Sequence, residues 1–166
     1  MLASTAPTLS LPTKVAGAAE SRELRFSHLH TREQLEVTYW KGGRYLPSAM
    51  ADIRHLLRDF RTGQARTIDP RLLDLLHDLK RATGSRKPFE VISGYRSPAT
   101  NRQLRARSEG VAGASLHMQG RAIDIRLGDV ALATLRDTAR AMKRGGVGYY
   151  AASNFVHVDT GRVRTW

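Results

Sequence analysis

The segment SLHMQGRAIDI places His117 and Asp124 on either side of a glycine, where a loop runs into an apolar stretch. Farther along, strand alternation in FVHVD puts His157 and Asp159 on one face and two valines on the other. Two imidazoles and a carboxylate are the ligand set of a catalytic zinc, which takes three N or O ligands at about 2.0–2.2 Å and keeps a fourth position open for water. These residue types therefore point to metal-assisted hydrolysis near neutral pH, with His157 as the candidate third ligand.

On spacing alone, simpler interpretations stay open. His117 also fits an exposed loop histidine, Asp124 a strand carboxylate paired with one of the many arginines, and His157 a hydrogen-bonded core histidine. His28 and His30 alternate on a predicted strand and are further candidates for the same cleft. The two histidines inside predicted helices are interpreted as packing residues.

The elements that must position these side chains follow from hydrophobic periodicity and turn signals. Residues 24–46 alternate apolar and polar around Lys41-Gly42-Gly43, which predicts two short antiparallel strands joined by a hairpin. Helical spacing appears in residues 47–60 and again in 70–83, the latter with Asp69 as N-cap and Gly84 beyond its end. Further strands are predicted at 89–94, 121–127, 147–150 and 154–160, with a loop and short basic helix within 97–108 and a longer helix at 130–143.

This order of elements predicts one α+β domain with a small, mostly antiparallel sheet and flanking helices. Residues 1–22 are small, polar and proline-containing, so we expect a flexible leader, either the remnant of signal cleavage or simply disordered. Residues 23–166 are then the folded domain.

The composition of the chain limits the classes of binding partner. The chain has 166 residues, no cysteine, and 27 Lys+Arg against 15 Asp+Glu, a formal net charge of +12. Without cysteine, disulfides and thiolate zinc sites are excluded. The charge favours an anionic partner, namely nucleic acid, a membrane surface or an acidic polymer such as a bacterial wall. Scattered basic residues without a nucleic-acid-binding motif argue against sequence-specific binding, and no apolar run is long enough to span a membrane.

SLHMQGRAIDI followed by GGVGYYAASNFVHVDTG resembles peptidase family M15, the D-alanyl-D-alanine carboxypeptidases and murein endopeptidases, with its pattern Ser-x-His, six residues, Asp and a distant His. From about residue 25 to the last residue, VTYW, IDPRLLDLLHDL, SGYRSPATN and HVDTGRVRTW follow in the order of the DUF882 branch, the periplasmic murein endopeptidases. This resemblance implies a zinc peptidase fold shared with hedgehog and D-Ala-D-Ala peptidases (the LAS type). It also implies Zn²⁺ as cofactor, peptidoglycan peptide stems as substrate and a location in the periplasm or cell envelope. We expect a monomer.

Carried onto this sequence, the resemblance implies that His117, Asp124 and His157 bind zinc. It also implies that Arg96 reaches the cleft to hold a substrate carboxylate or stabilise an oxyanion, with a surface salt bridge as the alternative. Ser115 and, beside Arg96, Tyr95 are expected at the substrate. For Ser115, a turn residue is an equally good interpretation.

One departure concerns the general base. Many relatives carry Glu or Asp three residues before the last histidine, where this chain has Asn154, which cannot accept a proton from water. Asp159 shares the strand face of His157 and is expected either as catalytic base or as a partner that fixes the imidazole tautomer. The alternative function is a non-catalytic, zinc-containing module that binds cell wall or protein. Non-specific nucleic-acid binding is a third hypothesis, which predicts metal-independent affinity with steep salt dependence.

Overall fold

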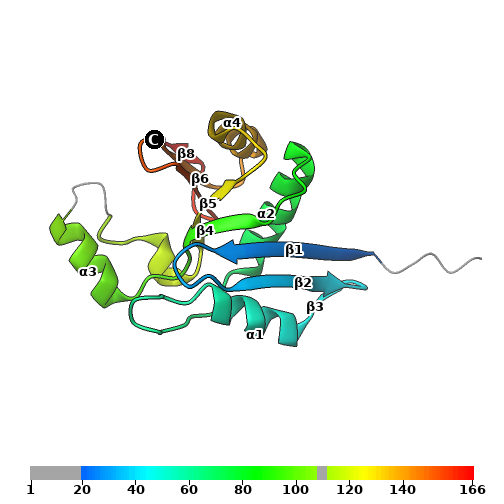
Figure 1. Cartoon of the computed structure of the whole chain (residues 1–166), viewed down its shortest axis with the longest axis horizontal. Coiled ribbons are helices and arrows are strands. Elements are labelled where there is room, and N and C mark those ends of the chain that lie inside the picture. Colours follow the sequence, from blue (N-terminus) through cyan, green and yellow to red (C-terminus); the bar gives the residue numbers. More distant parts are fainter. Residues whose placement is uncertain (1–19, 108–111) are drawn as a thin grey trace, which may run out of the picture.

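An 8-stranded sheet runs through the part of the chain that the computed structural model describes, residues 20–107 and 112–166 (Figure 1). Its strands are β1 Ser21–His28, β2 Gln34–Lys41, β3 Arg44–Tyr45, β4 Phe89–Ser93, β5 Ala122–Leu127, β6 Gly146–Tyr150, β7 Phe155–Asp159 and β8 Arg164–Thr165. The helices are α1 Pro47–Leu56, α2 Pro70–Thr83, α3 Pro98–Arg107, the 3-10 helix η1 Leu116–Gln119 and α4 Leu132–Met142.

The sheet is larger and more mixed than predicted. Its order is β3-β2-β1-β4-β5-β7-β6-β8, with β1–β4 and β6–β8 parallel and the other neighbours antiparallel. The single α+β domain is confirmed, but the small sheet is a wrong prediction. Its size was underestimated because the first predicted hairpin supplies three strands to the same sheet and because β8 is only two residues long.

The amino-terminal strands show why the size of the sheet was underestimated. Alternation continues from β1 through a short turn, in which Arg32 adopts a left-handed φ of 65°, into β2, which pairs antiparallel with β1. Gly42 and Gly43, at φ 56° and 85°, then make the predicted tight turn, but it joins β2 to the short β3. The glycine pair was correctly interpreted as a turn, and the earlier turn was missed.

The helices follow their end signals. Asp69 accepts a hydrogen bond from the backbone N–H of Arg71 as the N-cap of α2, and Gly84 ends the helix at φ 66°. This confirms the predicted helix with its caps. The predicted helix over 47–60 ends already at Leu56, and the chain turns back around the buried Asp59.

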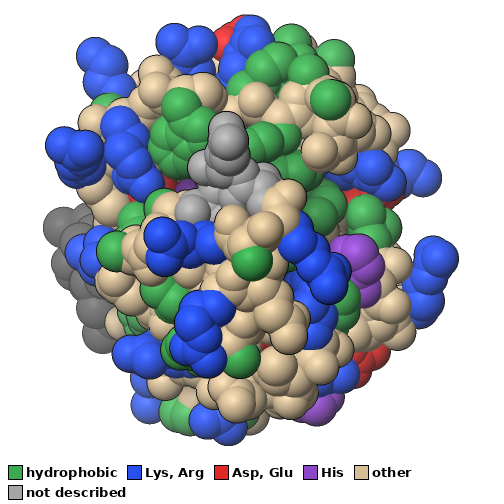
Figure 2. All heavy atoms as spheres, turned by 90° about the vertical axis from the view of Figure 1, so that its left-hand side faces the viewer, with side chains coloured by type: hydrophobic (Ala, Val, Ile, Leu, Met, Phe, Trp, Pro, Cys, Tyr) green, Lys and Arg blue, Asp and Glu red, His purple; other side chains and the backbone are tan. Residues whose placement is uncertain are grey.

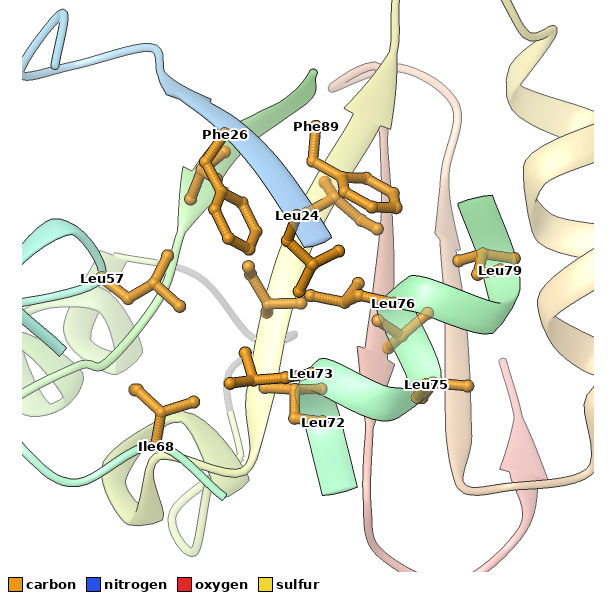
Figure 3. Packing of buried hydrophobic residues seen from close by; sticks show 14 of the residues in the cluster. Leu24, Phe26, Leu57, Ile68, Leu72, Leu73, Leu75, Leu76, Leu79 and Phe89 are labelled. Carbon is orange, nitrogen blue, oxygen red and sulfur yellow. The ribbon is translucent and has the colours of Figure 1, made fainter. Parts of the chain in front are cut away.

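The apolar core lies between the sheet and three helices. Helix α1 packs against β2, α2 against β1 and α4, and α4 against β5, β6 and β7. Figure 3 shows the leucines of α2 pointing toward side chains of β1 and β4. The labelled members are Leu24, Phe26, Leu57, Ile68, Leu72, Leu73, Leu75, Leu76, Leu79 and Phe89. At about 25 cal/mol per Å² of buried apolar surface, this packing is the main stabilising contribution to the fold.

Helix α3 stands at one end of the molecule in Figure 1, away from α2 and α4. In the described ranges, no helix combines the length and apolarity needed to cross a bilayer. Most of the predicted leader, residues 1–19, lies outside the described residues, and β1 already begins at Ser21.

Candidate functional site

The sheet register brings two of the predicted ligands together. Strands β5 and β7 run antiparallel with Asp124 directly opposite His157. Val156 and Val158 are fully buried in the core, as the alternation of FVHVD predicts. Asp124 and His157 therefore lie side by side on the other face, although 32 residues separate them in the sequence.

Helix η1 brings the third residue. It ends at Gly120, which has a left-handed φ of 67°. A Cβ at Gly120 would lie 2.1 Å from the carbonyl oxygen of Thr67, so only glycine fits here. The Gly120 carbonyl accepts a hydrogen bond from Asp69 N, 2.9 Å away, which ties η1 to the start of α2. This contact fixes where His117 projects.

His117, Asp124 and His157 converge through three atoms. His117 Nε2 lies 3.2 Å from Asp124 Oδ1 and 3.1 Å from His157 Nδ1, and His157 Nδ1 lies 2.9 Å from Asp124 Oδ1. All three residues are buried, with exposed fractions of 2%, 5% and 8%. The structure thus brings together the three residues that the sequence proposed as ligands.

The outer atoms of both imidazoles fix the tautomers. His117 Nδ1 lies 2.7 Å from the carbonyl oxygen of Gly94, which can only accept, so Nδ1–H donates. His157 Nε2 lies 3.0 Å from Asp159 Oδ2 and donates to that carboxylate. Both inward nitrogens therefore present lone pairs, as metal-binding histidines do.

These contacts test whether a metal fits. Two lone pairs and a carboxylate oxygen about 3 Å apart repel one another unless a cation lies among them, which is either a proton on His157 or a metal ion. Tetrahedral bonds of about 2.0–2.2 Å would separate the ligand atoms by about 3.3–3.6 Å, a few tenths of an ångström more than observed. His117, Asp124 and His157 therefore fit a zinc-type ion, with an N₂O donor set that does not by itself fix the metal.

The electrostatics agree with a cation at this point. Burial would raise the pKa of Asp124, but the charges and hydrogen bonds of His117 and His157 outweigh it and hold the pKa well below its usual range. Burial would lower the pKa of His157, but its bonds to Asp124 and Asp159 outweigh it and raise the pKa. The carboxylate is therefore ionised and aimed at the cluster.

Asp159 lies behind His157 and is fully buried. Its Oδ1 accepts from the backbone N–H groups of Gly146 at 2.9 Å and Gly161 at 2.8 Å, and its Oδ2 accepts from Arg164 Nη2 at 2.7 Å as well as from His157. Burial acts to raise the pKa of Asp159, but these bonds hold it well below its usual range. Within the described residues both oxygens accept hydrogen bonds from protein groups, and none of the Asp159 surface faces solvent.

Arg96 projects toward the ligand cluster from the loop after β4. Its Nη2 lies 3.6 Å from Asp124 Oδ2, and its Nη1 lies 3.4 Å from Asn101 Oδ1. Within the described residues its Nε has no hydrogen-bond partner although it is buried. Burial, partly offset by Asp124, lowers the pKa of this guanidinium, which is therefore held in the site with spare donors.

A cavity of about 620 Å³ opens over the cluster. Its described lining residues are His30, Arg61, Ile92, Ser93, Arg96, Leu104, Ala112, Ala114, Ser115, Leu116, His117, Asp124, Tyr150, Ser153, Phe155, His157, Arg164 and Trp166. The predicted site residues Arg96 and Ser115 are among them. Tyr95 is not among them, because its side chain is 7% exposed and packs in the apolar core.

The sequence named His28 and His30 as further candidates for the cleft, but it gave no indication of Trp166. His30 lines the cavity, whereas His28 is buried beneath it. Trp166 reaches the cleft because β6 has Gly148 opposite His157, and a Cβ on that glycine would lie 2.7 Å from the Trp166 ring. A glycine opposite a candidate ligand was the signal that could have identified this wall.

Asn154 occupies the turn between β6 and β7. It is exposed, has a left-handed φ of 54°, and is not among the described residues that line the cavity. Asparagine tolerates this conformation better than most residues, which gives it a structural reason here. Within the described lining, Asp124 is the sole carboxylate.

Comparison with known proteins agrees with this geometry. Residues 16–166 match a family of M15 peptidases described as peptidoglycan L,D-endopeptidase MepK. Over 145 residues the chain is 46% identical to the peptidoglycan L,D-endopeptidase MepK of Escherichia coli K12, covering 87% of this chain and 80% of that protein. The protein of the same name from Shigella flexneri gives the same values.

A more distant relative is the probable peptidoglycan L,D-endopeptidase MepK of Haemophilus influenzae, 41% identical over 146 residues, 87% of this chain and 78% of that protein. A search of solved structures gives no significant match.

Proposed function

This chain belongs to the M15 peptidase family of peptidoglycan L,D-endopeptidase MepK, and from that membership we propose that it hydrolyses peptide cross-links of bacterial peptidoglycan. The supporting observation is the convergence of His117 Nε2, Asp124 Oδ1 and His157 Nδ1 beneath an open cavity. A purely structural cluster would have no need of a cleft above it.

We propose zinc as the metal, held by His117, Asp124 and His157. When bound, zinc supplies a Lewis acid that polarises a peptide carbonyl and acidifies water, so hydrolysis is feasible near neutral pH. Residues of the chain orient the metal ligands and stabilise charge on the substrate. The Gly94 carbonyl holds His117 in the tautomer that points Nε2 inward, and Arg96 directs its spare donors to the charge that develops on the substrate oxygen or to a substrate carboxylate.

Asp159 is proposed as a positioning residue. Its hydrogen bonds all go to protein groups, so it holds His157 in the correct tautomer and has no free acceptor for a water proton. Ser115 is proposed to contact substrate, because it lines the cavity and its side chain makes no capping bond to η1.

Finer assignments follow from the same membership. We propose the LAS-type fold, with residues 23–166 as the peptidase domain, a monomer in solution and a location in the cell envelope or periplasm. For the bond, we propose the L,D linkage named for the relatives, which 3-3 cross-linked dimers carry.

The test is hydrolysis of purified 3-3 and 4-3 muropeptide dimers by the zinc-loaded protein, with products identified by mass. We expect 3-3 dimers to become monomers with wild type and with the matched control His55→Ala, whose side chain is 69% exposed, but not with His157→Ala. If zinc binds tightly and neither dimer is cut, the proposal fails in favour of a wall-binding module.

A further inference from the structure

The wall of the cleft is positively charged. Three arginines line the cavity, and Asp124 is the single carboxylate among its described lining residues. Arg164 is paired with Asp159 at 2.7 Å, and Arg96 faces Asp124 at 3.6 Å. For Arg61, no ion pair with a described residue is present. Within residues 20–107 and 112–166, Arg61 is thus the cleft guanidinium without a carboxylate partner.

Arg61 is nevertheless held in place. Its guanidinium carbon lies 4.1 Å from the centre of the Phe60 ring, and that ring stacks on His30 with centres 4.1 Å apart and an angle of 12°. A guanidinium over an aromatic face is attracted by the ring and keeps the N–H groups at its edge free to donate. The stack therefore orients the guanidinium of the exposed Arg61 and leaves its edge free to donate.

A buried carboxylate ties this stack to Arg96. Asp59 is 2% exposed, and its two oxygens accept from the backbone N–H groups of Arg61 at 3.0 Å and Ser97 at 2.8 Å. Burial would raise the pKa of Asp59, but bonds from Thr100 and Ser97 outweigh it and lower the pKa to about 2. Because Ser97 directly follows Arg96, one ionised side chain sets the positions of both arginines.

The two guanidiniums act on each other. Arg61 and Arg96 line the same cavity, and the positive charge of Arg61 acts on the Arg96 guanidinium. Like charges that share a cavity repel unless an anion lies between them. Figure 2 shows the α3 end of the molecule, where the cavity lining includes Leu104, and Lys and Arg side chains cover much of that face while few Asp or Glu appear.

We propose that Arg61 is a specificity residue that binds a carboxylate of the substrate peptide stem, in the same cleft as the metal ligands. The identity of the ligand as a peptidoglycan stem rests on the proposed function. A planar carboxylate matches the guanidinium edge in a two-bond arrangement, which favours it over a neutral amide at the same position.

The experiment compares stem peptides that carry their free carboxylates with the same peptides converted to primary amides. Binding to the full-length protein is measured by calorimetry, and kcat/KM is measured on the corresponding cross-linked dimers. We expect wild type to prefer the free carboxylate by about 10- to 100-fold, through KM rather than kcat. Arg61→Ala reduces this preference to near unity, and Arg61→Lys keeps part of it.

Arg66→Ala is the matched control, because it removes one positive charge from the same exposed loop without touching the described cavity lining. It should keep the full preference. The inference is overturned if Arg61→Ala retains the preference for the free carboxylate, or if it weakens the binding of both peptides equally. Arg61-dependent binding without any cleavage would support the inference and refute the proposed hydrolysis. Cleavage with a carboxylate preference that does not depend on Arg61 would support the proposed hydrolysis and refute this inference.

Discussion

Replacing Asp159 by asparagine should separate a positioning role from a catalytic one. The two side chains have the same shape, but the amide has one donor group and one acceptor. If Nδ2 faces His157 Nε2 and Arg164 Nη2, it meets two donors, and His157 must move its proton to the inward nitrogen. If Nδ2 is turned the other way, it meets the N–H groups of Gly146 and Gly161.

Either orientation disrupts two hydrogen bonds of a fully buried group, by two donor–donor contacts in one case and by one such contact and a displaced His157 proton in the other. At about 1–3 kcal/mol for each of the two disrupted bonds, Asp159→Asn should lower the free energy of unfolding by about 2–6 kcal/mol. Loss of the tautomer lock should weaken zinc binding by about 10- to 100-fold. Urea unfolding in chelator measures the first effect, and competition with a chromophoric chelator measures the second.

Asp137→Asn is the control, since this carboxylate is 58% exposed in its pair with Arg136 and should leave the free energy of unfolding nearly unchanged. The reasoning is refuted if Asp159→Asn is as stable as wild type and binds zinc equally well, yet cuts no dimer. Asp159 would then be the proton acceptor and not a positioning residue.

Three further predictions concern stability. Burial lowers the pKa of His28 to about 4, below its ordinary 6.5, so the unfolded chain binds an extra proton between these values. Urea midpoints should therefore show stability falling by up to about 3 kcal/mol as pH drops from 6.5 to 4, and falling less in His28→Asn. Gly120→Ala should lower the free energy of urea unfolding by about 3 kcal/mol or more, because the new Cβ would collide with Thr67. Gly63 also has a positive φ but has open space around it, so Gly63→Ala should lower this free energy by about 1–2 kcal/mol. Equal losses in the two variants would contradict the packing argument. Zinc at about 1,000 times its Kd should stabilise the protein by about 4 kcal/mol, raising the melting temperature, and His117→Ala should abolish that shift.

The features that could be predicted from the sequence are those whose signals are local. Asp69 and Pro70 mark the start of helix α2 and Gly84 marks its end, and each of these signals depends only on the local sequence. Likewise, alternation within β7 separates the core valines from His157 and Asp159 without reference to any other strand. The ligand set came from residue types and family resemblance, and the geometry places its members together.

What escaped prediction depends on distant partners. The pattern that predicts a helix over 47–60 does not mark Asp59 as buried. The donors that stabilise this carboxylate are the backbone N–H groups of the distant Ser97 and of Arg61, in the turn that forms around Asp59. In the same way, Tyr95 next to a cleft arginine suggests a substrate contact, and only the packing around Leu57 shows that it belongs to the core.

Two buried carboxylates organise the two walls of the cleft without belonging to its surface. Asp59 joins the turn carrying Arg61 to the loop after β4, and Asp159 joins β7 to the start of β6 and to Arg164. A buried charge is costly unless several donors surround it, so each carboxylate is stable only when the segments it joins are in their native positions. Loss of either would move ligands and substrate contacts together. A fall in activity on changing Asp59 or Asp159 therefore identifies a catalytic group only if stability and zinc affinity are unchanged in the same variant.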